Sequence, residues 1–228
     1  MPKSLKTVRG AKGHFLANRH KPLIYQQVES KKDYITPMVF DTAENMEANL
    51  DWMIEIPVLY YICREDEQYW YVYYLIFHPF DWSSSPVGFV RKLNSHLYDT
   101  EGICFRVDKK SGTKDIATIY HNSILFQANT TRLVYIESQG HGILPPKHLN
   151  FKLSGAFKLY RYNYELVTLE NITKDQWNEI KKKLCGVNIP HEQGDTLWVR
   201  DSMGTRHRRG DMYLRPDRLF KKAEEWRI

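Results

Sequence analysis

Residues 69 to 77 constrain the fold more than any other stretch, because all nine side chains are aromatic or aliphatic (Tyr-Trp-Tyr-Val-Tyr-Tyr-Leu-Ile-Phe). The run is about half as long as the ~18 apolar residues that a membrane helix requires. Its aromatic and β-branched residues favour a strand. Because residues of both alternating faces are apolar, we expect a central strand that is covered on both sides.

The remaining pattern predicts a mainly β protein, a β-sandwich with a few peripheral helices. A chain of 228 residues with 14% aromatic residues is long enough for one such domain. The charged residues 64 to 67 predict a tight hairpin between strands at 54–62 and 69–77. Further strands are predicted at 99–107, 115–121, 132–138 and 195–200, and a hairpin is predicted from 157–162 and 165–169. Short helices are predicted within 41–53 and 216–226 and, with a capping box at its start, at 173–184.

The first 22 residues are basic and lack periodicity. We expect residues 1–22 to form an N-terminal arm and residues 23–228 to form the single β-sandwich domain. The arm either contacts an anionic partner or lies along the surface as an ordinary chain terminus.

Residues 94 to 107 combine charged ligand types with a buried strand pattern. If a strand begins near Asp99, then Asp99 and Glu101 share a face with apolar residues further along it. Carboxylates at the edge of a core require a cation or several hydrogen-bond donors. His96 precedes them by three residues, so the group predicts a divalent-metal site, although a solvated charged loop shows the same spacing.

Three more residues are candidate ligands of the same ion. Asp81 lies in a turn-rich loop after the aromatic run, where it is either a ligand or a turn residue. His121 ends a predicted strand. His141 lies between two glycines that let the backbone bend sharply around its ring. Each histidine is alternatively an ordinary surface or core residue.

The formal net charge of +6 permits an anionic partner, such as a membrane surface or nucleic acid, without requiring one. The densest basic cluster contains Arg206, Arg208 and Arg209 between two glycines. Arginine binds phosphate or carboxylate in a bidentate way, so these three residues are candidate ligand-binding residues. A solvated loop is the alternative.

Three widely spaced cysteines exclude a disulfide framework and a cysteine-based zinc site, and they indicate a reducing compartment. The beginning of the sequence is basic without a following apolar run, so we expect a cytoplasmic protein without a signal peptide. We expect no transmembrane segment. The sequence has no nucleotide-binding glycine motif and no nucleophile-elbow motif.

The pattern His96-x-x-Asp99-x-Glu101 resembles the metal-binding heptapeptide (Gly-His-Arg-His-Asp-Trp-Glu) of the necrosis- and ethylene-inducing-like proteins, which are β-sandwich cytolysins. The order of neighbouring motifs is also similar to the vacuolar-protein-sorting-associated relatives of that fold. These further motifs are Tyr69–Trp70, Tyr120–His121, Val134–Tyr135 and His141–Gly142, and the resemblance covers roughly residues 54 to 145. It implies the sandwich and the metal site.

The chain departs from the heptapeptide at Ser95, Tyr98 and Thr100. The upstream aspartate of the toxins would fall near Gly88, so that ligand is absent or is replaced by Asp81. The toxins are secreted, whereas no signal is visible here. The resemblance therefore does not imply cytolytic activity.

Three hypotheses for the function follow. In the first, a divalent ion and the basic loop bind an anionic or sugar-bearing ligand, such as a lipid head group. In the second, the same His/Asp/Glu site is a metal-dependent hydrolase. In the third, the protein is a non-catalytic interaction protein that binds nucleic acid or another anionic partner. Two carboxylates favour Ca²⁺ or Mg²⁺, whereas participation of His121 or His141 would favour Zn²⁺, Mn²⁺ or Fe²⁺.

Overall fold

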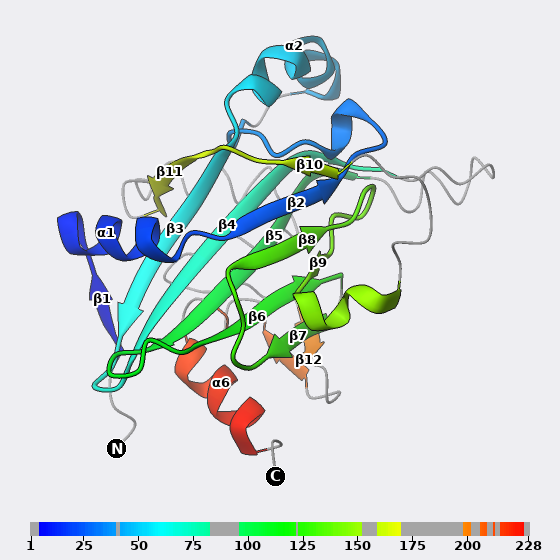
Figure 1. Cartoon of the computed structure of the whole chain (residues 1–228). Coiled ribbons are helices and arrows are strands. Elements are labelled where there is room, and N and C mark those ends of the chain that lie inside the picture. Colours follow the sequence, from blue (N-terminus) through cyan, green and yellow to red (C-terminus); the bar gives the residue numbers. More distant parts are fainter. Residues whose placement is uncertain are drawn as a thin grey trace.

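The computed structural model describes residues 5–39, 42–82, 96–121, 123–151, 159–169, 198–201, 206–208, 212 and 215–225. Two β-sheets dominate it (Figure 1). The large sheet has the strand order β1-β3-β4-β5-β6-β7-β12-β13, and β11 pairs with β3 beside this path. Its strands are β1 (Lys6–Val8), β3 (Val58–Glu65), β4 (Tyr69–Asp81), β5 (His96–Asp108), β6 (Lys114–Tyr120), β7 (Ser123–Gln127), β11 (Glu165–Thr168), β12 (Trp198–Asp201) and β13 (Arg206–Arg208).

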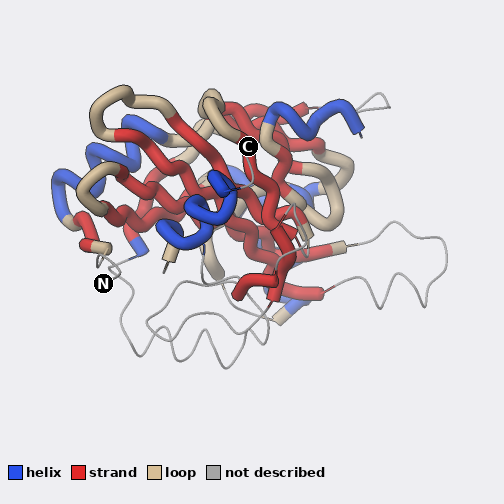
Figure 2. Tube along the Cα trace, turned by 90° about the horizontal axis from the view of Figure 1, so that it is seen from below, coloured by secondary structure: helices blue, strands red, loops and turns tan. Residues whose placement is uncertain are grey.

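The small sheet has the order β10-β2-β8-β9 and covers one face of the large sheet (Figure 1). Its strands are β2 (Leu23–Gln27), β8 (Leu133–Ile136), β9 (Ile143–Leu144) and β10 (Leu159–Arg161). Figure 2 shows the helices at the edges and outer faces of the two layers. They are α1 (Gly10–His20), α2 (Ala43–Glu55) and α6 (Pro216–Glu225), with short 3-10 helices at η1 (Lys31–Asp33) and η2 (Pro146–Phe151). The predicted β-sandwich with peripheral helices is confirmed.

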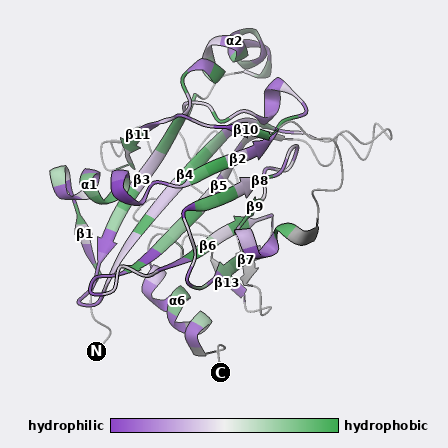
Figure 3. Cartoon of the chain, in the orientation of Figure 1, coloured by the Kyte–Doolittle hydropathy of each residue, from purple (hydrophilic) through white to green (hydrophobic). Residues whose placement is uncertain are grey.

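One hydrophobic core fills the space between the sheets. Ile24 of β2 and Val134 of β8 pack with Ile76 of β4 and Phe105 of β5, and all four side chains are buried. A second core lies on the opposite face of the large sheet, where Phe220 of α6 packs with strand residues. Hydrophobic residues accordingly follow the strands, while the turns between them are hydrophilic (Figure 3).

The aromatic run forms the centre of β4, and both of its faces are covered as predicted. β4 pairs antiparallel with β3 through the predicted tight turn and antiparallel with β5 on its other side. In the β4–β5 register, His78 lies opposite Asp99 and Ile76 lies opposite Glu101. These pairs lie on the inner face of the sandwich, which continues into the core at Ile103.

The N-terminal residues differ from the expected arm. Lys6–Val8 pair with β3, and the following residues form α1. The hydroxyl of Tyr74 donates a hydrogen bond to the carbonyl oxygen of Ala17 at 2.7 Å, and Leu16 and Ala17 are buried. Basic side chains on the exposed side of α1 conceal this buried stripe in the sequence.

The predicted hairpin at 157–169 is wrong, because its two strands belong to different sheets. β10 pairs antiparallel with β2, whereas β11 pairs parallel with β3. The strand predicted at 54–62 begins later, because α2 continues to Glu55. The closing helix is confirmed as α6. The helix predicted at 173–184 lies outside the described residues. No described helix is long and apolar enough to cross a membrane.

Candidate metal centre

Three buried residues from separate parts of the chain converge at one end of the sandwich. His78, Asp99 and His141 each offer a ligand atom, and these atoms all lie within 4.8 Å of one another. The histidines are fully buried and Asp99 is 7% exposed. The arrangement combines two imidazoles and one carboxylate, which is a donor set that divalent transition metals accept.

The sheet register positions the first two of these residues. His78 and Asp99 are a directly opposed pair of β4 and β5, so their side chains start side by side on the inner face. His141 follows β8 in the turn before β9 and has a positive φ of 50°. A Cβ at Gly142 would lie 2.7 Å from Cδ2 of Tyr120, so the flanking glycine allows this turn to pack closely against β6. The turn places the ring of His141 over the β4–β5 pair.

Asp33 is a fourth buried member of the site. Its Oδ2 accepts hydrogen bonds from the backbone N–H groups of Glu29 and Ser30, both at 2.8 Å. Its Oδ1 accepts from Nε1 of Trp82 at 2.6 Å and from the backbone N–H of Gln139 at 2.8 Å. Burial alone would raise the pKa of Asp33, but the hydrogen bonds from His141, Gln139 and Glu29 outweigh it and lower the pKa. The carboxylate is therefore ionised.

His141 bridges this carboxylate and Asp99. Its Nδ1 lies 3.0 Å from Oδ2 of Asp99, and its Nε2 lies 3.4 Å from Oδ1 of Asp33. Burial favours the neutral ring, but hydrogen bonds to Asp33 and Asp99 outweigh it and raise the pKa of His141 to about 9. Without an ion, His141 is an imidazolium that offsets the charge of two buried carboxylates.

His78 has the opposite electrostatics. Burial, together with the nearby His141, holds the pKa of His78 well below its usual value, so the ring is neutral. Nε2 of Gln26 donates to the backbone carbonyl of Asp33 and lies 3.2 Å from Nε2 of His78. An amide nitrogen only donates, so Nε2 of His78 accepts and Nδ1 carries the proton. This buried Nδ1 has no hydrogen-bond partner among the described residues.

The residues present fit a metal ion. Metal-binding histidines usually donate their second ring N–H to a carboxylate. Asp33 provides this carboxylate at Nε2 of His141, which leaves Nδ1 directed at Asp99. Release of the Nδ1 proton would turn the present imidazolium into a ligand. His78 would supply a further nitrogen if its proton moved to Nε2, which would require rotation of the Gln26 amide.

The residues that the sequence singled out lie in different places. Asp99 belongs to the cluster, and Glu101 follows it on the inner face with 2% exposure. His96 opens β5 opposite Asp81 in the β4–β5 register. Its side chain lies outside the described part of the structure. The role of His96 as a ligand therefore stays a prediction.

His121 and Asp81 are not members of the described cluster. The side chain of His121 is 43% exposed, places Nε2 against a carboxylate oxygen of Glu137 and packs its ring against Tyr120. A Cβ at Gly140 would lie 2.7 Å from Cε1 of His121, so this imidazole covers the outside of the turn that carries His141. Asp81 is half-buried at the end of β4.

The basic cluster lies apart from the buried histidines. Arg206–Arg208 form β13, at the end of the large sheet, and Arg206 is exposed. Four strand spacings separate β13 from β5, which is roughly 19 Å across the sheet. Arg209 lies outside the described residues. The role of these arginines in ligand binding stays a prediction.

Sequence reasoning missed His78, Asp33 and Gln26. His78 follows directly on the aromatic run, so pairing that run with 99–107 would have placed a histidine opposite Asp99. Asp33 is the last residue of a capping box that begins at Ser30, a local pattern that is visible in the sequence. The contact of Gln26 with His78 depends on how the two sheets pack.

No protein-family model matches the sequence, and a search of curated proteins finds no match. Solved structures are similar in fold. A triple mutant of NLPPya has a TM-score of 0.50 at 15% identity and covers 81% of this chain and 87% of its own. NLPPya in complex with glucosamine has a TM-score of 0.48 at 14% identity, with coverage of 81% and 87%. Necrosis and Ethylene inducing Protein 2 from the causal agent of cocoa's witches' broom disease has a TM-score of 0.47 at 11% identity, with coverage of 78% and 82%. The β-sandwich of this chain is the fold of the necrosis- and ethylene-inducing proteins.

Proposed function

We propose that this protein binds a divalent metal ion at the inner end of its sandwich and uses that ion to bind an anionic or sugar-bearing ligand. Asp99 and His141 are the first two ligands of the ion, and His78 is the third. The observation that carries the proposal is the convergence of these three buried side chains, with ligand atoms within 4.8 Å of one another.

The donor set favours a transition metal over Ca²⁺ or Mg²⁺. Calcium and magnesium prefer sites built from oxygen atoms, whereas imidazole suits Zn²⁺ and Fe²⁺, and carboxylate oxygens also suit Mn²⁺. Glu101 is the neighbouring carboxylate on the same face and can add an oxygen ligand. We therefore infer Zn²⁺ or Mn²⁺ as the resident ion.

An ion with three protein ligands retains coordination positions for other oxygen atoms. Sugar hydroxyl, carboxylate and phosphate oxygens all bind such positions. Asp99 is buried but keeps 7% of its surface exposed, whereas His78 and His141 keep none, so its side is where a ligand would meet the ion. The head group of a lipid contains oxygens of these kinds, which is the ligand class that we propose.

Elemental mass spectrometry of the purified protein tests the metal. We expect about one Zn²⁺ or Mn²⁺ per wild-type chain and loss of most of it in Asp99→Asn and His141→Gln. Asp51→Asn is the matched control, because Asp51 is an exposed carboxylate on α2. Wild-type protein that takes up no metal from solutions of Zn²⁺, Mn²⁺, Ca²⁺ or Mg²⁺ would reject the proposal.

Calorimetric titration then tests the ligand. The first probes are glucosamine and glucose 6-phosphate, each added to metal-loaded and chelator-treated protein. Binding that requires the metal and disappears in Asp99→Asn supports the second half of the proposal. Equal binding with and without the metal would place the ligand elsewhere.

A further inference from the structure

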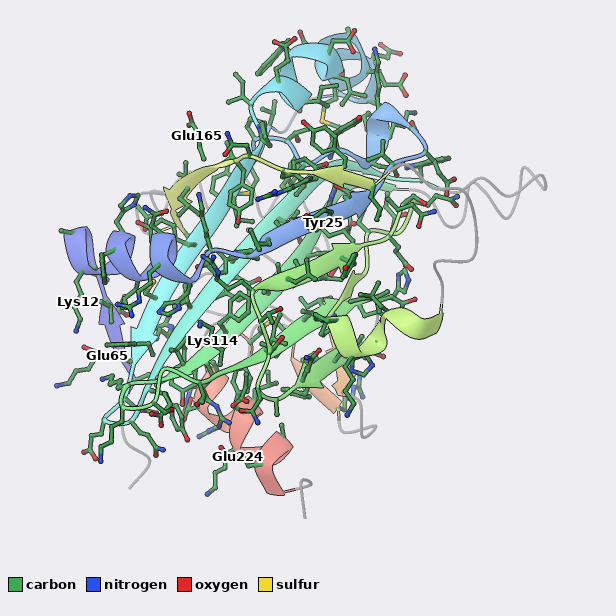
Figure 4. All side chains as sticks on the ribbon, in the orientation of Figure 1. Lys12, Tyr25, Glu65, Lys114, Glu165 and Glu224 are labelled. Atoms are coloured by element: carbon green, nitrogen blue, oxygen red, sulfur yellow. The ribbon has the colours of Figure 1, made fainter. Side chains whose placement is uncertain are left out.

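A group of basic side chains lies at the opposite end of the sandwich from the metal cluster. Arg19 and His20 end α1, Lys114 opens β6, and Arg132 precedes β8. Lys114 pairs with Val107 of β5, eight residues along that strand from Asp99. Eight residues of a strand span roughly 26 Å, so the basic group is remote from the metal cluster. Figure 4 shows Lys114 near the end of α1.

These cations are close to one another and to His20. Nη1 of Arg132 donates a hydrogen bond to the carbonyl oxygen of Arg19 at 3.3 Å. Burial, together with the charges of Lys114, Arg19 and Arg132, lowers the pKa of His20 from 6.5 to about 4. The imidazole is therefore a neutral group within reach of three positive charges.

No described carboxylate forms an ion pair with Arg19, Lys114 or Arg132. This contrasts with Lys12 on the same helix, whose Nζ pairs with Glu65 at 3.0 Å. Like charges repel one another when no anion lies between them. The group therefore has an excess of positive charge that an anionic ligand would offset.

Two buried polar side chains in the same region lack hydrogen-bond partners. Both ring nitrogens of His20 and the hydroxyl oxygen of Thr130 are buried without a partner among the described residues. His20 is 4% exposed and Thr130 is 9% exposed. Unsatisfied buried polar atoms are uncommon in native proteins, because each one loses its hydrogen bonds to water without replacement. A ligand with several oxygen atoms would satisfy them.

The backbone holds these residues in fixed positions. The N–H of Thr130 donates to the carbonyl oxygen of Lys114 at 2.8 Å, and the N–H of Leu23 donates to that of Arg132 at 2.7 Å. Three elements, the end of α1, the start of β6 and the start of β8, are thereby joined at one place. A site built on such elements needs little rearrangement to bind a ligand.

We propose that Arg19, His20, Lys114 and Arg132 form a binding site for a phosphate or sulfate group. Arg19 is exposed, and Lys114 and Arg132 are half-exposed, so the cations meet the anion first. The nitrogens of His20 are covered in the described structure, so binding requires a side chain of the group to turn aside. The imidazole of His20 then donates to one oxygen of the anion, and the hydroxyl of Thr130 is available for a second hydrogen bond.

Calorimetric titration with inorganic phosphate and with sulfate tests the site. Sodium chloride at equal ionic strength is the control for general salt effects. We expect saturable binding of wild-type protein, weakened about tenfold in Lys114→Gln and in Arg132→Gln. Lys12→Gln is the control, because it removes one positive charge from α1 outside the group. An equal loss in Lys12→Gln, or no saturable binding by the wild type, would overturn the proposal.

Imidazole NMR provides a readout at His20 itself. Phosphate should shift the ring resonances of His20 in the wild type and leave those of exposed His14 in place. Vesicles of phosphatidylcholine with and without phosphatidic acid then distinguish a lipid source from free phosphate. If the phosphate group that binds in nature belongs to a lipid, vesicles that contain phosphatidic acid should compete with inorganic phosphate, and vesicles of phosphatidylcholine without it should not. A shift that is equal at both histidines would reflect non-specific association and would reject the site.

Discussion

The rings of His78 and His141 stack with their centroids 3.8 Å apart and their planes 8° from parallel. The two rings differ in charge, because burial keeps His78 neutral while Asp33 and Asp99 keep His141 protonated. A neutral ring that lies face to face with an imidazolium avoids the repulsion that two cations would suffer. The stack therefore explains how two buried histidines coexist before any ion binds.

Asp33→Asn should destabilise the protein by about 3 kcal/mol, because it removes one partner of a buried ion pair. The amide also places an NH₂ group against donors, since both oxygens of Asp33 accept from N–H groups. Urea unfolding followed by tryptophan fluorescence measures the change.

Asp51→Asn is the matched control for this measurement. Asp51 forms an ion pair with Lys31, but both side chains are exposed, and such pairs contribute under about 1 kcal/mol. Similar unfolding midpoints for Asp33→Asn and Asp51→Asn would contradict the assignment of Asp33 as a buried structural anion.

The affinity of single variants for Zn²⁺ distinguishes two possible sets of metal ligands, both of which include Asp99. The resemblance in sequence implies His96 and Glu101, whereas the described structure assembles His78 and His141. We expect His78→Gln to lower the affinity for Zn²⁺ by about tenfold or more, and His96→Gln to leave it nearly unchanged. A competition titration with a fluorescent chelator measures both. The reverse order would show that the ion lies at the sequence-predicted residues.

The central strands could be predicted from the sequence because their apolar residues identify them without knowledge of their neighbours. Residues 69 to 77 are apolar on both faces, and 99 to 107 alternate, which is sufficient to place β4 and β5. Pairing of β10 with β2 and of β11 with β3 is not encoded in this local pattern. Adjacent strands more often pair with each other, and here the chain crosses between sheets at Tyr162.

Only part of the metal cluster can be predicted from the sequence, because its other members come together through long-range packing. The sequence identifies Asp99 as a candidate ligand because this carboxylate precedes an apolar strand. It identifies His141 as a candidate because glycines flank this residue. The sequence pattern places His78 at the start of a turn-rich loop, whereas β4 continues through it to Asp81. Asp33 acts through its contact with His141, and a contact between residues so far apart in sequence follows from packing alone.

Gly13→Ala should destabilise the protein, although alanine is the better helix former by about 1 kcal/mol. A Cβ at Gly13 would lie 2.5 Å from the carbonyl oxygen of Val8, and this backbone atom belongs to a paired strand. We expect a net loss of about 1–3 kcal/mol in thermal unfolding. Asn18→Ala on the exposed side of α1 is the control and should stabilise slightly. A higher melting temperature in Gly13→Ala would contradict this prediction. It would show that β1 and α1 can move apart to admit the methyl group without loss of stability.

The stability of the protein should fall between pH 6.5 and pH 4 because of His20. Its pKa is lowered from 6.5 to about 4 in the folded protein by burial and by the charges of Lys114, Arg19 and Arg132. Across this range the unfolded chain binds a proton that the folded chain excludes, so lowering the pH favours unfolding. At pH 4 and below, the accumulated loss is at most about 3 kcal/mol.

Comparison of the wild type with His20→Gln isolates the contribution of His20 to the pH dependence of stability, because the carboxylates titrate in the same way in both proteins. Urea unfolding at pH 7 and pH 4.5 should show a larger decrease for the wild type than for His20→Gln. Addition of phosphate at pH 4.5 should reduce the difference, since an anion beside His20 offsets the three cations that oppose its protonation. Equal pH dependence in the two proteins would show that His20 titrates at its ordinary pKa and is reached by water in the folded state.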